Sequence, residues 1–185
     1  MISKTTKIGF DLDGVFINRP PLVPKSVIEW LYMRKSNGLS YRFPGKIEQK
    51  IRIISHLPYF RPPIKHNLCS LLDLSSQRFE ILLISSRFSF LRERTNKWDG
   101  KNNLFKYFRK IYFNEKDEQP YLFKDKIIKK EKINIFIDDD LDLLFYLANK
   151  NAAVDFYWLS KARTKKTFPK NITQIKTLDD FLKYV

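Results

Sequence analysis

Short runs of apolar residues alternate along this chain with longer segments in which apolar positions recur at helical spacing. The apolar runs end at Asp, Asn or Ser, which is typical of strands, and they cover residues 7–10, 79–84, 111–113, 133–137 and 154–159. The helical patterns cover residues 64–74, 88–110 with a turn at 99–100, 122–132, 141–150 and 178–184. This alternation predicts an α/β fold, a Rossmann-like three-layer sandwich with a parallel sheet between two layers of helices.

Residues 17–60 interrupt this alternation. A proline cluster, NRPPLVPK, follows the first predicted strand, and helical spacing then appears at 26–39 and again at 45–56. We therefore expect a core formed by residues 1–16 and 61–185, with a small helical cap inserted at residues 17–60.

Polar residues follow three of the predicted strands. Because the carboxyl ends of parallel strands meet at one edge of a sheet, we expect these residues to converge near the point where the strand order reverses. They are Asp11 and Asp13 after the first strand, Ser85, Ser86 and Arg87 after the second, and Asp138, Asp139 and Asp140 after the fourth.

The acidic residues in this set predict a metal site. Clustered carboxylates repel each other, and Mg²⁺ removes the conflict because it binds a few carboxylates together with the oxygens of a phosphate. One carboxylate of the DLD sequence can then attack phosphorus while the other protonates the leaving oxygen. The Ser85 hydroxyl suits the phosphate, and Lys124, with Lys126 in reserve, suits its developing charge. For Arg87, phosphate binding and pairing with an acid remain equally open.

The order of these motifs resembles that of the haloacid dehalogenase superfamily. IGFDLDGV at residues 8–15 is similar to the first motif, ILLIS ending at Ser85 to the second, and IFIDDD at residues 135–140 to the fourth. Lys124 takes the place of the lysine that precedes the fourth motif. The resemblance extends from residue 7 to about residue 160, which is most of the chain.

The resemblance implies roles for individual residues. Asp11 would be the nucleophile and Asp13 the general acid and base. The phosphate would be bound by Ser85 and Lys124. Ser86 and Arg87, which follow Ser85, are further candidates for phosphate binding. The Mg²⁺ ligands would be Asp11, Asp13 through its backbone carbonyl, Asp138 and Asp139.

The second aspartate of DLDG favours phosphatase or phosphotransferase chemistry, since the dehalogenases of this family lack it. The short helical insertion, the ISSR sequence and the FIDDD sequence look most similar to 5′-nucleotidase-like members with a small C1-type cap. The expected partner is thus a small phosphorylated anion, with a nucleoside monophosphate foremost. A phosphorylated nucleic-acid end is the alternative substrate, and a non-catalytic binding or regulatory protein is the alternative class.

The net charge of +15 bears on that choice. Residues 17–61 contain nine basic and two acidic residues, residues 101–132 ten and five, and residues 159–176 six and none. Residues 133–158, which include the DDD sequence, contain one basic and five acidic residues. Basic segments therefore surround the predicted acidic site and would attract an anion, unless the lysines reflect only the general composition of the chain.

Other classes of protein are disfavoured. The single cysteine, Cys69, excludes an internal disulfide framework and a multi-cysteine zinc site. The sequence has no membrane-length apolar run and no signal-peptide pattern, so we expect a cytoplasmic protein without a membrane partner.

Overall fold

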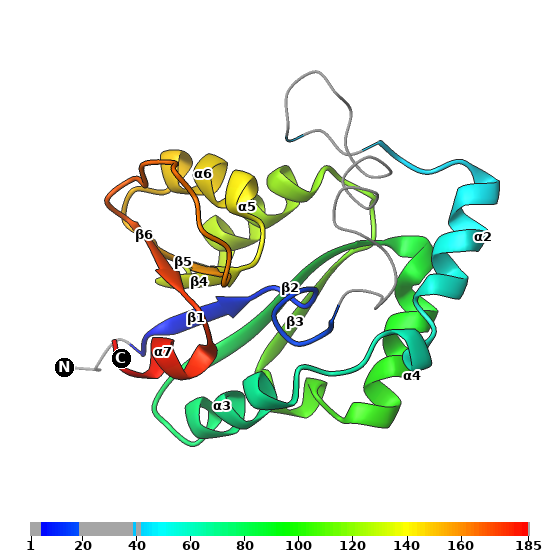
Figure 1. Ribbon diagram of the computed structural model, residues 1–185, viewed down its shortest axis with the longest axis horizontal. Helices are drawn as coiled ribbons and strands as arrows, with labels where there is room; N and C mark the ends of the chain where they lie inside the picture. Colours follow the sequence, from blue (N-terminus) through cyan, green and yellow to red (C-terminus); the bar gives the residue numbers. More distant parts are fainter. Residues whose placement is uncertain (1–4, 19–38, 40–41, 185) are drawn as a thin grey trace.

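A six-stranded, entirely parallel sheet forms the centre of the computed structural model, which describes residues 5–18, 39 and 42–184 (Figure 1). The strand order is β3-β2-β1-β4-β5-β6. The strands are β1 (Lys7–Phe10), β2 (Glu80–Phe88), β3 (Lys110–Asn114), β4 (Ile135–Asp138), β5 (Asp155–Leu159) and β6 (Ile172–Ile175). The helices are α2 (Lys46–Ser55), α3 (Lys65–Ser75), α4 (Arg92–Asn102), α5 (Pro120–Glu131), α6 (Leu141–Lys150) and α7 (Leu178–Leu182), with short 3₁₀ turns at Pro58–Phe60, Ser89–Leu91 and Phe105–Tyr107.

Helices cover both faces of the sheet, as the alternation of elements predicts. In Figure 1, α5 and α6 lie on one side of the strands, and α3 and α7 lie on the other. Neighbouring residues of one strand therefore enter different cores: Ile81 and Leu83 of β2 pack with α3 and α7, whereas Leu82 and Ile84 pack with α5 and α6. Burial on both faces explains why the central strands are continuous apolar runs. The predicted α/β, Rossmann-like three-layer fold is confirmed.

Two local predictions are wrong, and one strand was missed. Strand β2 does not stop before Ser85 but continues to Phe88, with a register shift against β3 after Ser85. Helix α4 passes through the expected turn at Asp99 and Gly100 and ends at Asn102, followed by Asn103 in a left-handed conformation. Strand β6 was not predicted, because its sequence ITQI contains no apolar run.

Part of the predicted cap can be described. Helix α2 confirms the helical pattern at 45–56, whereas the pattern at 26–39 lies almost entirely outside the described residues. The division into core and cap stays a prediction. Among the described helices, none combines the length and the apolar character needed to cross a lipid bilayer.

Candidate active site

The candidate site lies at the carboxyl edge of the sheet, where β1 is flanked by β2 on one side and β4 on the other. The chain places β2 and β3 on one side of β1 and β4 to β6 on the other, so this is the point where the strand order reverses. Asp11 directly follows β1, and its backbone N–H donates to the carbonyl of Ile137 at 3.0 Å. This pairing places Asp11 beside Asp138, the last residue of β4.

Three carboxylates converge here. One oxygen atom from each of Asp11, Asp138 and Asp139 lies within 4.8 Å of the others. Gly14 makes room for this group: it has a φ of +74°, and a Cβ atom at this position would stand 2.1 Å from Cγ of Asp139. The sharp turn after DLD therefore needs glycine both for its backbone conformation and for the space that the Asp139 carboxylate occupies.

Lys124 bridges two of these acids. Its Nζ atom lies 2.9 Å from Oδ1 of Asp11 and 2.6 Å from Oδ2 of Asp138, and all three side chains are buried. Lys126, the reserve choice, lies on the surface of α5 and pairs with Glu118 instead. A buried ammonium ion between two carboxylates is a strong electrostatic arrangement, because little water is present to screen it.

The buried charges shift each other's pKa. Burial raises the pKa of Asp11 to about 7; Lys124 opposes this shift, and the nearby Asp138 and Asp13 add to it. Burial also raises the pKa of Asp138 to about 6, against the effect of Lys124 and with that of Asp139. For Lys124, burial lowers the pKa, but the two carboxylates outweigh it and hold the pKa above its ordinary value. The site thus contains more negative charge than its single lysine neutralises.

The donor set fits Mg²⁺. Asp11, Asp138 and Asp139 offer only carboxylate oxygens, which are the ligands preferred by this hard cation. Burial raises the pKa of Asp11 and of Asp138, and a divalent cation beside them would favour their ionised forms. In contrast, cysteine and histidine are absent from this cluster of described residues.

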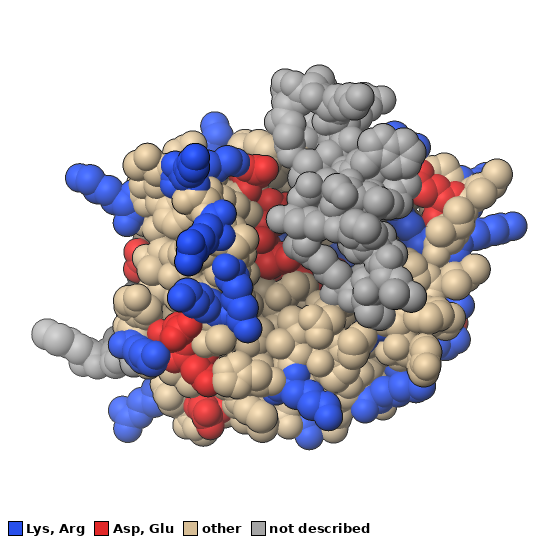
Figure 2. All heavy atoms as spheres, viewed as in Figure 1, with Lys and Arg blue, Asp and Glu red and all other residues tan. Residues whose placement is uncertain are grey.

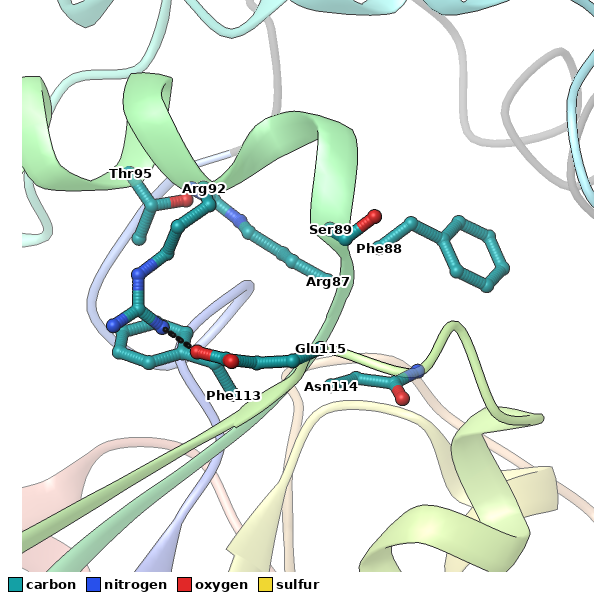
Figure 3. Close-up of a pocket in the computed structure, with 8 residues that line it drawn as sticks. All are labelled: Arg87, Phe88, Ser89, Arg92, Thr95, Phe113, Asn114 and Glu115. Carbon is teal, nitrogen blue, oxygen red and sulfur yellow. Dashed lines mark hydrogen bonds and ion pairs between the residues drawn. The ribbon is translucent and has the colours of Figure 1, made fainter.

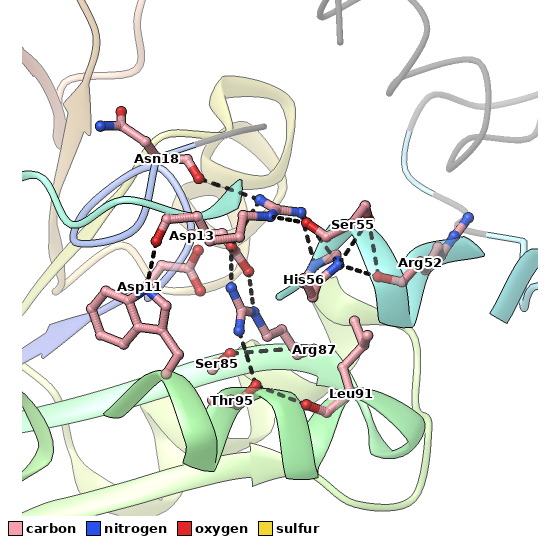
Figure 4. A network of polar contacts seen from close by, with 12 residues as sticks. Asp11, Asp13, Asn18, Arg52, Ser55, His56, Ser85, Arg87, Leu91 and Thr95 are labelled. Carbon is pink, nitrogen blue, oxygen red and sulfur yellow. Dashed lines mark hydrogen bonds and ion pairs between the residues drawn. The ribbon is translucent and has the colours of Figure 1, made fainter. Parts of the chain in front are cut away.

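The side chain of Asp13 is not part of this cluster. Its two oxygens accept from Nε and Nη2 of Arg87 at 2.7 and 2.6 Å (Figure 4). The guanidinium of Arg61 adds a second cation, with Nη1 at 3.6 Å from Oδ1. Burial alone raises the pKa of Asp13, but Arg87 and Arg61 outweigh it and hold the pKa well below its usual range. The sequence left phosphate binding and pairing with an acid equally open for Arg87; in the structure Arg87 pairs with an acid, Asp13.

The network behind Asp13 was not anticipated from the sequence. Arg61 also lies 2.8 Å, through Nη2, from Nε2 of His56, whose Nδ1 donates to the carbonyl of Arg52 at 2.7 Å. Burial and the two arginines at the site lower the pKa of His56 to about 3, so its ring is neutral. Nothing in the sequence context of His56 indicates this contact. Figure 4 shows how the network connects α2 with the loop after β1.

The two serines differ in their surroundings. Ser85 is buried, and its Oγ accepts from the backbone N–H of Arg87 at 3.5 Å. It lies two residues beyond Leu83, which pairs with Phe10 of β1, so it stands at the same edge of the sheet as Asp11. Ser86 is only partly buried, and its carbonyl accepts from the side chain of Asn114 at 3.5 Å.

A pocket of about 220 Å³ opens beside Arg87 (Figure 3). Its lining consists of Arg87, Phe88, Ser89, Arg92, Thr95, Phe113, Asn114 and Glu115. The guanidinium of Arg92 stacks 3.6 Å from the centre of the Phe113 ring and lies 3.5 Å from Glu115, so the charges within the pocket are largely paired.

Comparisons with known proteins identify the fold. No family model and no curated protein matches the sequence. A haloacid dehalogenase-like hydrolase from Streptococcus pneumoniae superposes with a TM-score of 0.65 and 13% identity, over 97% of this chain and 98% of that one. The D,D-heptose 1,7-bisphosphate phosphatase from B. bronchiseptica, complexed with magnesium and phosphate, gives 0.57 and 12%, over 98% and 100%. A mutant haloacid dehalogenase family enzyme from Bacteroides thetaiotaomicron, also with magnesium and phosphate, gives 0.54 and 15%, over 88% and 98%.

Proposed function

We propose that this chain, which has the fold of haloacid dehalogenase-family hydrolases, is a Mg²⁺-dependent phosphatase that cleaves phosphomonoesters through an aspartyl-phosphate intermediate. The observation that carries the proposal is the buried Asp11–Lys124–Asp138 arrangement at the carboxyl edge of the sheet. A structural ion pair alone does not require a third carboxylate, Asp139, beside it, nor a glycine that leaves space for that carboxylate.

In the proposed reaction Asp11 is the nucleophile. One carboxylate oxygen of Asp11 attacks phosphorus, a bond from Asp11 to phosphorus forms, and the bond to the leaving oxygen breaks. Asp13 gives its proton to the leaving oxygen, so the product is a neutral alcohol. Water then attacks the same phosphorus, Asp13 accepts a proton from it, and Asp11 is released together with inorganic phosphate.

The other residues serve charge and position. Lys124 holds Asp11 in place and offsets the negative charge that develops on the phosphoryl oxygens. Ser85 and the neighbouring backbone donors would bind those oxygens. Mg²⁺ held by Asp11, Asp138 and Asp139, with the backbone carbonyl of Asp13, would neutralise charge on the phosphoryl group.

Asp13 must be released before it can transfer a proton. Its carboxylate is bound by Arg87 through two hydrogen bonds, and this pairing favours the ionised form. In the proposed reaction, a substrate phosphoryl group competes for Arg87 and frees Asp13, whose carboxylate then takes up a proton from solvent and turns toward the leaving oxygen. The nucleoside monophosphate and the phosphorylated nucleic-acid end, both anticipated from the sequence, remain predictions for the substrate.

Hydrolysis of 4-nitrophenyl phosphate with and without Mg²⁺ tests the proposal. We expect metal-dependent turnover by the wild type and a loss of roughly 10³-fold or more in Asp11→Asn, because removal of a nucleophile is among the most damaging changes to an enzyme. Asp73→Asn, at an exposed position of α3, is the matched control and should retain full activity. An inactive wild type on a broad panel of phosphoesters, with or without Mg²⁺, would favour the non-catalytic alternative.

A further inference from the structure

The connection between β5 and β6, residues 160–171, is a basic loop. It contains five basic and no acidic residues: Lys161, Arg163, Lys165, Lys166 and Lys170. All five are exposed. Lys166 pairs with Asp142 at 2.5 Å, whereas in the part of the chain that the structure describes the other four have no acidic side chain within ion-pair distance.

The basic loop is fixed next to the candidate active site. Trp158, at the end of β5, donates from Nε1 to the carbonyl of Asp139 at 3.1 Å. The ring of Phe168 packs against Trp158 at 5.8 Å and against Phe145 of α6 at 6.2 Å. Gln174 of β6 donates to the carbonyls of residues 160 and 162, both at 2.8 Å. These contacts hold the loop against the same end of β5 and α6 that carries the acidic cluster.

The surface view agrees with this placement. Figure 2 shows basic side chains gathered over the region that Figure 1 labels α6 and β6, next to a strip of acidic side chains. A positive rim beside a negative metal site attracts a substrate that carries charge beyond the group that reacts.

Several lysines elsewhere are neutralised within their own helix. Lys129 pairs with Asp125 and Lys97 with Glu93, each one helical turn away. The basic loop has no such partner in its own sequence, so its like charges repel one another in the free protein. A bound polyanion removes this repulsion and releases counterions from both partners.

We propose that the basic loop binds the sugar-phosphate backbone of a single-stranded nucleic acid whose terminal phosphate enters the site at Asp11; this rests on the proposed phosphatase function. The site that would bind the reacting phosphoryl group is formed by buried side chains, among them Asp11 and Asp138. The cations of the loop lie outside it on the surface. A nucleoside monophosphate has no second phosphate with which to reach them, whereas a strand end presents one at every following nucleotide.

The test measures binding and turnover separately. The probes are a short oligothymidylate with a phosphate at either end, the same oligonucleotide without a terminal phosphate, thymidine monophosphate and 4-nitrophenyl phosphate. The loop variant combines Lys161→Gln, Arg163→Gln and Lys165→Gln. The matched control removes the same charge with Lys130→Gln, Lys132→Gln and Lys150→Gln, which are exposed residues near the carboxyl ends of α5 and α6, at the opposite edge of the sheet.

For wild type and control, we expect phosphorylated oligonucleotide to be hydrolysed with a higher kcat/KM than thymidine monophosphate. Three phosphate contacts give a slope of about −2 for log affinity against log salt, which weakens binding roughly 20-fold between 50 and 200 mM salt. The loop variant should lose most of that salt dependence and the preference for the oligonucleotide, while its kcat/KM for 4-nitrophenyl phosphate stays unchanged.

Equal oligonucleotide binding and equal salt slopes in the loop and control variants would overturn the inference. So would a kcat/KM for thymidine monophosphate that equals or exceeds that for the oligonucleotide. Failure of the phosphatase proposal gives a different result: the wild type is then inactive toward 4-nitrophenyl phosphate, whether or not it binds the oligonucleotide.

Discussion

Replacing Gly14 with alanine should affect the metal site more than it affects folding. The new Cβ atom would stand 2.1 Å from Cγ and Oδ2 of Asp139. These are the last atoms of a short side chain, so Asp139 can rotate away and relieve the clash, but it then leaves the carboxylate cluster. The remaining cost to folding is that of alanine at a φ of +74°, about 1–2 kcal/mol.

We therefore expect Gly14→Ala to lower the free energy of unfolding in urea by about 1–2 kcal/mol. We expect the apparent Mg²⁺ affinity, from the metal dependence of turnover, to fall about 10–100-fold, as is usual when the surroundings of a metal ligand are disturbed. Gly100→Ala is the control, because a Cβ there meets no atom within 4 Å and α4 should be stabilised by up to about 1 kcal/mol. Wild-type Mg²⁺ affinity in Gly14→Ala would refute this reasoning, as would a further loss of affinity when Gly14→Ala is added to Asp139→Ala.

Three further predictions concern the buried charges. Lys124→Met should destabilise the metal-free protein by roughly 3–5 kcal/mol, because it leaves two buried carboxylates unpaired. Lys126→Met, the control, should change the free energy of unfolding by less than about 0.5 kcal/mol. Urea unfolding of both variants measures the two effects. Asp11 and Asp138 have raised pKa values in the folded state, so the stability that their protonated forms contribute to the metal-free protein should be greatest below about pH 4 and be lost as pH rises toward 7. Saturating Mg²⁺ should remove this loss of stability. Unfolding midpoints at pH 5 and pH 8, measured with and without Mg²⁺, test this prediction. Arg87→Lys should lower kcat/KM about 10–100-fold for both an alkyl phosphate and 4-nitrophenyl phosphate, because lysine cannot form the paired hydrogen bonds by which Arg87 would bind the phosphoryl group. An unchanged kcat/KM on both substrates would contradict a contact between Arg87 and the phosphoryl group.

The fold could be predicted because the central strands carry a simple signal. Strands β1, β2 and β4 are buried on both faces, so their apolar runs are uninterrupted up to the polar residues of the site. Strand β6 has no comparable signal, since only Ile172 and Ile175 of its four residues are buried. Helix α4 was broken at Gly100 in our prediction because glycine usually marks a turn, but an exposed glycine costs a helix only about 1 kcal/mol.

The choice between the two lysines could have been made from the sequence. Lys124 precedes Ile127 and Ile128 by three and four residues, so it lies on the buried face of α5, whereas Lys126 does not. By contrast, the contacts of Arg61 with Asp13 and with His56 depend on where the chain returns to the core after α2. No periodicity encodes such a return, so this part of the site required the structure.

The most direct test of the account is to find the phosphoryl group on the protein. Wild type and Asp13→Asn are mixed with substrate and Mg²⁺, quenched in acid within one turnover, digested and analysed by mass spectrometry. We predict that the peptide containing Asp11 gains the mass of one phosphoryl group, most of all in Asp13→Asn, which should break down the intermediate slowly. An unmodified Asp11 peptide in both proteins, while phosphate is still released from the substrate, would contradict nucleophilic attack by Asp11.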